Sequence, residues 1–285
     1  MTYKLTDMSG MEAEKAFKER DTAVFPIGAV HPHGDITLGI DNHSIEEISN
    51  RLGKRMKGKI IGLPLIPYGY SAADLGLGLP GRARAGDITV SENCLYEMVM
   101  DVCRSIVKHG IKRIIFLNGH GPNTAILTRV AVDLMNELSV LSAVIDWWVL
   151  IGELKGHVDP TYKDAHFTEP DVDLALGKLK DATLLKLYES KVPNLHKKIL
   201  GDKLIPKYDL PIATRIGLRK IGVQFEKGSV IIPLPQATPQ DYVAPVGDLG
   251  DRVSASKGED ILETIVDYLE KFIEEFQKAV IPNDI

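Results

Sequence analysis

The segment that most restricts the fold of this chain lies between residues 113 and 123. Residues 113–117 (RIIFL) form a mostly apolar run that is typical of a buried strand. The run ends in Asn-Gly-His-Gly-Pro-Asn, and a helical pattern begins at Thr124. The sequence therefore predicts that His120 lies at the carboxyl end of a strand, where open α/β sheets bind their ligands.

A second strand-like run, residues 24–30, is followed at once by His31-Pro32-His33-Gly34. In extended backbone, residues two apart point the same way, so His31 and His33 can face one point in space. The carboxylate of Asp41 follows just before the next helical pattern. Imidazole and carboxylate groups together suit zinc, manganese or iron, so this region is a candidate metal site.

Two alternatives stay open for the acidic residues. Asp41 could instead cap a helix that begins near Ser44, which is a common role for aspartate. Glu169 and Asp171 are two residues apart, so in extended backbone one could serve as a ligand and the other could support it. They could equally be two solvated acids. The remaining histidines are interpreted as hydrogen-bonding or capping residues: His43, His109, His157 and His196.

Strand-like and helical runs alternate along the chain, which predicts an α/β fold with a mostly parallel sheet flanked by helices. We expect one domain over residues 1–285, and the irregular stretch at about 184–235 can accommodate an inserted hairpin or small subdomain. The expected strands are 24–30, 59–66, 113–117 and 140–147. The expected helices are 44–56, 91–109, 124–138 and 259–278.

The composition narrows the function classes. A net charge of -5 without an extended basic stripe argues against a nucleic-acid binder. No apolar run approaches the length of a membrane span and no secretory pattern opens the chain, so we expect a cytoplasmic protein. Cys94 and Cys103 are nine residues apart within one expected helix, too far for a disulfide there. We expect both to be small buried residues.

Four motifs, in the same order along the chain, resemble those of the creatininase (creatinine amidohydrolase) family. His33-Gly34 and residues 38–41 resemble E-Q-H-G-x-H-L-P-x-x-T-D, and residues 118–123 match N-G-H-G-x-N. Residues 166–173 resemble H-A-x-E-x-E-T-S. Residues 247–258 resemble G-D-P-x-x-A-T-x-x-K-G. The resemblance spans most of the chain, and the shared order makes it more specific than any single motif.

The resemblance implies an α/β fold with a two-metal centre at the carboxyl ends of the strands, often in a homo-oligomer. By position, His33, Asp41 and His120 match metal ligands, with Asp41 in the bridging place. His166 matches a histidine assigned to proton transfer or substrate contact. The family takes a further ligand from a glutamate where this chain has Pro122, and we expect Glu169 to replace it.

Two departures from the family pattern bear on the substrate. His31 stands where the family has a ligand glutamate, which removes one negative charge and alters the preference for metal or substrate. Arg82 and Arg84 replace part of an F-P-G-T pattern and are candidate substrate-binding residues, although surface arginines are as common. Creatinine is therefore not the expected substrate.

The sequence thus favours a metal-dependent hydrolase that opens a small polar cyclic substrate, such as a cyclic amide. The expected cofactor is a pair of divalent ions, with zinc favoured over manganese or iron. Ring opening of a diketo-cyclitol, as in the family's 3-dehydro-scyllo-inosose hydrolases, is the second hypothesis. A metal-binding protein without turnover is the third. The expected metal ligands are His31, His33, Asp41, His120 and Glu169, with His166 as the catalytic acid or base.

Overall fold

The computed structural model describes residues 2–31, 36–71, 86–155, 168–179, 186–190, 201–207, 222–231, 242–248 and 253–281. Within these ranges, no helix combines the length and the apolar character that a membrane crossing requires.

A four-stranded parallel sheet forms the centre of the fold, in the order β2-β1-β3-β4. Its strands are β1 (Thr22–Ile27), β2 (Ile61–Gly62), β3 (Arg113–Asn118) and β4 (Leu141–Asp146). Each is reached from its predecessor through a helical or irregular connection, as parallel pairing requires. The prediction of a mostly parallel α/β sheet is confirmed.

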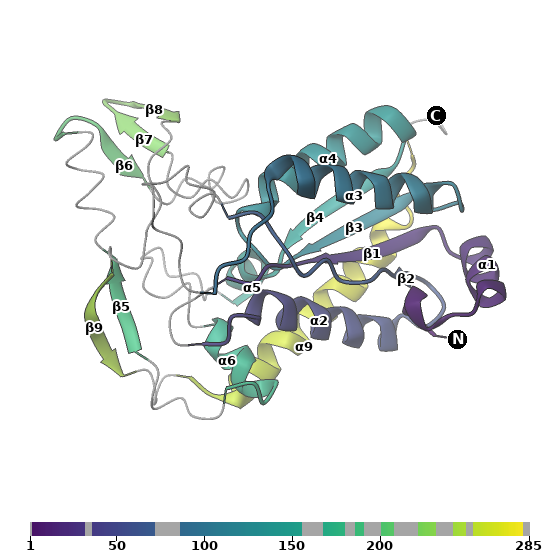
Figure 1. The fold of residues 1–285 in the computed structure, drawn as a ribbon, viewed down its shortest axis with the longest axis horizontal. Coiled ribbons are helices and arrows are strands. Elements are labelled where there is room, and N and C mark those ends of the chain that lie inside the picture. Colours follow the sequence, from purple (N-terminus) through teal and green to yellow (C-terminus); the bar gives the residue numbers. More distant parts are fainter. Residues whose placement is uncertain are drawn as a thin grey trace.

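Helices cover both faces of this sheet (Figure 1). They are α1 (Gly10–Glu19), α2 (Ile40–Arg55), α3 (Glu92–Val107), α4 (Asn123–Leu138), α5 (Trp147–Lys155), α6 (Thr168–Ala175) and α9 (Ala255–Phe276), with a 3-10 turn at Leu5–Asp7. In β3, Ile114 and Phe116 pack into the core beneath α1, α3 and α4, whereas Ile115 and Leu117 pack into the core shared with α2 and α9. This alternation is what the two-residue period of a strand dictates, and burial on both faces explains why the run carries no polar residue between 114 and 117.

Local capping interactions explain why α3 begins and ends close to the expected residues. Ser91 caps α3 by accepting a hydrogen bond from the Cys94 amide, and Gly110, with a φ of 105°, lies just beyond its end. Cys103 is buried on this helix as expected, but Cys94 is exposed, so the prediction of burial was wrong for it. Cys94 lies in the first turn of the helix, where the face turned to the sheet begins only at Leu95.

Two expected elements differ from the observed ones. The strand expected at 59–66 shrinks to Ile61–Gly62 plus a bridge between Ile66 and Ile27. Pro64 interrupts it, because proline has no amide hydrogen to donate to a ladder. The helix expected from Ser44 begins four residues earlier, at Ile40, so Asp41 lies inside its first turn and not before it.

Antiparallel strands occupy part of the C-terminal half. Strands β6 (Ile205–Lys207), β7 (Gly222–Phe225) and β8 (Gly228–Ile231) form one sheet, and β5 (Lys186–Ser190) pairs with β9 (Tyr242–Asp248). Residues Glu226 and Lys227 form the tight β7–β8 turn. That the stretch at about 184–235 is a separate insertion stays a prediction.

Candidate active site

The two histidine segments meet at the carboxyl edge of the sheet. Strands β1 and β3 are neighbours, and the last paired residues are Ile27 and Asn118. His31 and His120 follow these ends, and their ring centroids lie 4.9 Å apart. The expectation that the two strand ends deliver their histidines to one place is met for this pair.

Asp41 joins His120 at this edge. Its Oδ2 lies 2.8 Å from Nδ1 of His120, and the two side chains are only 2% and 3% exposed. An ionisable pair this deeply buried is costly unless its charges are compensated by each other or by a bound ion. The capping alternative for Asp41 is not what the structure shows, since α2 begins at Ile40 with Gly39 at its N-cap.

Two glycines allow these backbones to approach one another. A β-carbon at Gly119 would lie 2.1 Å from the carbonyl oxygen of Asp41, and one at Gly28 would lie 2.0 Å from Oδ1 of Asn42. Both distances are far below van der Waals contact. The glycines after β1 and β3 therefore bring the start of α2 against the strand ends, and with it Asp41.

The asparagines of the segment 118–123 fold the turn that carries His120. The side-chain oxygen of Asn118 accepts from the His120 amide at 3.1 Å, and its Nδ2 donates to the His120 carbonyl oxygen at 2.8 Å. Asn118 also donates to Asp146, at the end of β4. Asn123 donates to the Gly28 carbonyl oxygen and accepts from the Tyr70 amide. These fully buried amides tie the neighbouring strand ends together.

Sequence reasoning missed two side chains at this site. Ser71 is buried, and its Oγ lies 3.0 Å from Nε2 of His120 and 3.4 Å from Nδ1 of His31. Asp87 has no exposed side-chain surface, and its Oδ1 lies 2.9 Å from Nδ1 of His31. Neither follows a predicted strand. The sequence pointed to Asp87 only through Gly86, which precedes it and is typical of a backbone turn.

A short segment with defined contacts holds Asp87 in place. Gly86 adopts a φ of 88°, and a β-carbon there would lie 2.5 Å from the Leu38 side chain. The Ile88 amide then donates to the Val30 carbonyl oxygen, and the Val90 amide donates to that of Gly69. The chain around Asp87 is thereby fixed against the residues that precede His31 and Ser71.

Tyr70 also lies beside the site, next to Ser71 in the chain. Burial, together with a hydrogen bond to Glu92, raises the pKa of Tyr70 to about 12. The phenol therefore keeps its proton at neutral pH.

The acids of α6 are buried and helical. Glu169 is 7% and Asp171 4% exposed, so the alternative of two solvated acids is wrong. The assumption of extended backbone is also wrong, because both residues belong to the helix α6. Residues two apart in a helix point to different sides. Asp171 instead accepts a hydrogen bond from the Ser254 amide at the start of α9. The role of Glu169 as a ligand stays a prediction.

Four predicted site residues lie outside the described part of the chain: His33, Arg82, Arg84 and His166. Within the described part, no three His, Cys, Asp or Glu side chains form a metal-binding group. The donor chemistry nevertheless fits a divalent ion, since two imidazoles and two carboxylates meet at one buried edge. One further observation agrees: Oδ2 of Asp87 is buried without a hydrogen-bond partner among the described residues.

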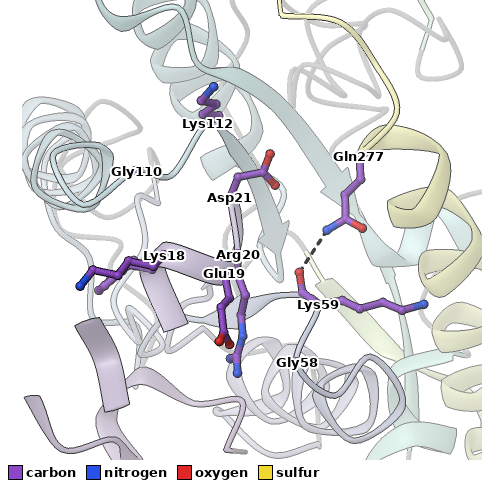
Figure 2. Close-up of a pocket in the computed structure, with 10 residues that line it drawn as sticks. Lys18, Glu19, Arg20, Asp21, Gly58, Lys59, Gly110, Lys112 and Gln277 are labelled. Carbon is purple, nitrogen blue, oxygen red and sulfur yellow. Dashed lines mark hydrogen bonds between the residues drawn. The ribbon is translucent and has the colours of Figure 1, made fainter. Parts of the chain in front are cut away.

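A pocket of about 700 Å³ lies elsewhere, at the amino ends of the strands (Figure 2). It is lined by residues that precede strands, among them Asp21 before β1, Lys59 before β2 and Lys112 before β3. The histidines lie at the opposite ends of these strands. The chemistry expected of such a sheet belongs to its carboxyl edge, so this pocket is not the candidate active site.

Comparison with known proteins relates this chain to one family. Residues 6–273 match the family model described as creatininase, creatinine amidohydrolase. A creatinine amidohydrolase of Pseudomonas putida is 26% identical over 112 residues, which is 39% of this chain and only 41% of that relative. The crystal structure of creatinine amidohydrolase has a TM-score of 0.67 at 20% identity, covering 99% of this chain and 98% of its own. A creatininase structure with Mn has a TM-score of 0.65 at 19% identity, covering 99% and 100%.

The fold is therefore that of the creatininases, and the match over residues 6–273 shows that the chain belongs to the creatininase family.

Proposed function

We propose that this chain is a metal-dependent hydrolase that opens a small polar cyclic substrate other than creatinine, with a cyclic amide as the favoured class. Membership of the creatininase family supports amide hydrolysis. The observation that carries the proposal is the meeting of His31, Asp41 and His120 at the carboxyl edge of the sheet. Ring opening of a diketo-cyclitol remains the second hypothesis within the same class of reaction.

The residues proposed to hold the metal are His31, His33, Asp41, His120 and Glu169. A creatininase with Mn and a mutant creatininase of the Zn–Zn type support the use of divalent ions in this family. Divalent ions bound here would lower the pKa of a water molecule and polarise a carbonyl oxygen.

The chain's own side chains supply the remaining chemistry. Asp41 and His120 are held by the Asn118–Asn123 turn and by the close approach at Gly119, so their donor atoms are positioned before any ligand arrives. His166 is proposed to pass a proton to the leaving group, which suits an imidazole near neutral pH. Arg82 and Arg84 are proposed to bind the polar groups of the substrate.

Metal analysis with a matched pair of histidine variants tests this proposal. The purified protein should contain at least one tightly bound transition metal per chain, and chelation should abolish turnover of a cyclic amide. His120→Ala should lower metal content by about tenfold or more. His109→Ala is the control, since His109 stacks on Phe17 at the other end of the sheet and should leave metal content unchanged. A protein that takes up neither zinc, manganese nor iron after reconstitution would overturn the proposal.

The substrate class is tested by a direct comparison of creatinine, other cyclic amides and keto-cyclitols. Arg82→Ala and Arg84→Ala should each raise KM or lower kcat/KM while metal content stays intact. Efficient hydrolysis of creatinine with no preference for any other ring would show that His31 and the two arginines do not redirect specificity. Stoichiometric metal without turnover of any of these compounds would favour the non-catalytic metal-binding protein.

One geometric observation favours a second candidate mechanism. The side chains of Ser71, His120 and Asp41 lie in the order of a serine hydrolase triad, with a hydrogen-bond distance of 3.0 Å from Oγ to Nε2 and an ion-pair distance of 2.8 Å from Nδ1 to Oδ2. Ser71 is only 3% exposed, which is unfavourable for a nucleophile. In this mechanism Ser71→Ala would abolish turnover and chelators would not. The metal mechanism predicts inhibition by chelators.

A further inference from the structure

The clearest unassigned contact at the site joins two segments 56 residues apart in sequence. Oδ1 of Asp87 lies 2.9 Å from Nδ1 of His31. The aspartate side chain is fully buried and that of the histidine is 15% exposed. A buried carboxylate without a compensating donor is strongly unfavourable, so this contact is a main source of stabilisation for Asp87.

The chemistry of the pair fixes the direction of the hydrogen bond. An ionised carboxylate only accepts, so the imidazole must carry its proton on Nδ1 and donate to Asp87. In the neutral imidazole, Nε2 is then the nitrogen that holds the lone pair. Among the described residues, Ser71 also lies near Nδ1, but its Oγ is 3.4 Å away and closer to His120, at 3.0 Å. Of these two residues, Asp87 is therefore the stronger partner of His31.

We propose that Asp87 is a positioning residue: it holds His31 in the Nδ1-protonated tautomer and presents Nε2 as the donor atom for a metal ion. The inference rests on the proposed metal-dependent function, and it adds a residue to which no role had been assigned. A carboxylate that accepts from the outer nitrogen of a ligating histidine orients the ring and raises its basicity. Asp87 also returns one negative charge to the neighbourhood of His31.

A tautomer measurement tests the proposal without any metal or turnover. Long-range ¹H–¹⁵N NMR of the metal-free protein at about pH 8.5, about two pH units above the ordinary imidazole pKa, distinguishes protonated from unprotonated ring nitrogens. The His31 signals are assigned from their loss in His31→Gln. We expect the proton on Nδ1, and Asp87→Ala should move the population toward the Nε2-protonated form. A His31 ring that carries its proton on Nε2 in the wild type would overturn the proposal.

A double-mutant cycle with zinc tests the consequence for binding. Asp87→Asn keeps the shape of the side chain and should weaken zinc affinity by about 10- to 100-fold in chelator competition. His31→Glu places a second carboxylate against Asp87, so in that background Asp87→Asn should leave affinity unchanged or strengthen it by relieving like-charge repulsion. Equal losses in both backgrounds would overturn the positioning role.

The matched control is Asp133→Asn, which removes a carboxylate that accepts from the Tyr96 hydroxyl between α3 and α4. It should leave both the tautomer and zinc affinity unchanged. The two measurements also separate the two proposals. A protein that binds no zinc but shows the expected tautomer refutes the metal-dependent function, whereas one that binds zinc with unchanged affinity in Asp87→Asn refutes only the role of Asp87.

Discussion

Gly119 and Asp41 pack so closely that no side chain fits at position 119. A β-carbon there would lie 2.1 Å from the Asp41 carbonyl oxygen and 3.0 Å from its carbonyl carbon. The obstacle is backbone at the first turn of α2, which cannot rotate aside as a flexible side chain could. The turn after β3 and the start of α2 are thereby locked together, and this contact sets the distance between Asp41 and His120.

Gly119→Ala should separate these two segments. We expect a loss of about 1–3 kcal/mol in the free energy of unfolding, the range typical of overpacking at a tight site. Metal content should fall as well, because Asp41 and His120 can no longer keep their spacing. Chemical denaturation and metal analysis of the same preparation measure the two effects.

The control for this substitution is Gly10→Ala. Gly10 opens α1, and a β-carbon there meets nothing within 4 Å. The change should be neutral or stabilising by up to about 1 kcal/mol, since alanine favours the helix. A Gly119→Ala protein as stable as Gly10→Ala, with full metal content, would show that the close approach is not needed.

The sheet could be predicted from the sequence because a short local pattern of residues marks each buried strand. The run 114–117 is apolar throughout because both faces of β3 are covered, and the glycines that follow mark its end. The length of β2 could not be predicted in the same way. Residues 59–66 have the composition of a strand, but the hydrogen-bond loss at Pro64 limits pairing to Ile61–Gly62.

The candidate site was only partly predictable, because only some of its residues belong to segments with a local sequence pattern. His31, Asp41 and His120 follow strands or begin a helix, so their meeting follows from the topology of a parallel sheet. Asp87 and Ser71 belong to irregular segments without periodicity. A bridge between residues 30 and 88 and a backbone hydrogen bond between residues 69 and 90 place them beside the histidines. No local sequence pattern predicts these two contacts.

Glu169 is the acid whose role most needs a direct test. It is buried in the first turn of α6, at 7% exposure. Glu169→Gln keeps the size of the side chain but removes the charge that a divalent ion requires, so we expect metal occupancy or kcat/KM to fall about tenfold or more. Unchanged metal binding and turnover would restrict Glu169 to a structural role within α6.

The two cysteines should react at very different rates. Cys94 is exposed, whereas burial raises the pKa of the Cys103 thiol to about 12. A thiol reagent such as DTNB at neutral pH should therefore modify one thiol rapidly and the second only on unfolding. Cys94→Ser should remove the fast phase. Rapid modification of both thiols in the folded protein would contradict the buried position of Cys103.

Ion pairs join α9 to the end of α2 and to Lys59, which follows α2 in the chain. Arg55 contacts both Asp267 and Glu263, and Nζ of Lys59 lies 2.7 Å from Oε1 of Glu274. The hydrogen bond from Arg55 holds the pKa of Asp267 below its ordinary value, and the hydrogen bond from Lys59 does the same for Glu274. Both carboxyl groups are exposed, so each pair contributes little by itself.

The contribution of Asp267 should depend on pH in a defined direction. Because its pKa is lowered in the folded state, its stabilisation is present above the ordinary carboxyl pKa of about 4 and is lost as the pH falls through the folded value. Asp267→Asn should therefore lower the Tm at neutral pH, by on the order of 1 °C. The difference from wild type should shrink as the pH falls below the ordinary carboxyl pKa, and it should also shrink in about 1 M salt. Circular-dichroism melts across this range measure it, and a difference that is independent of pH would assign the effect to packing and not to charge.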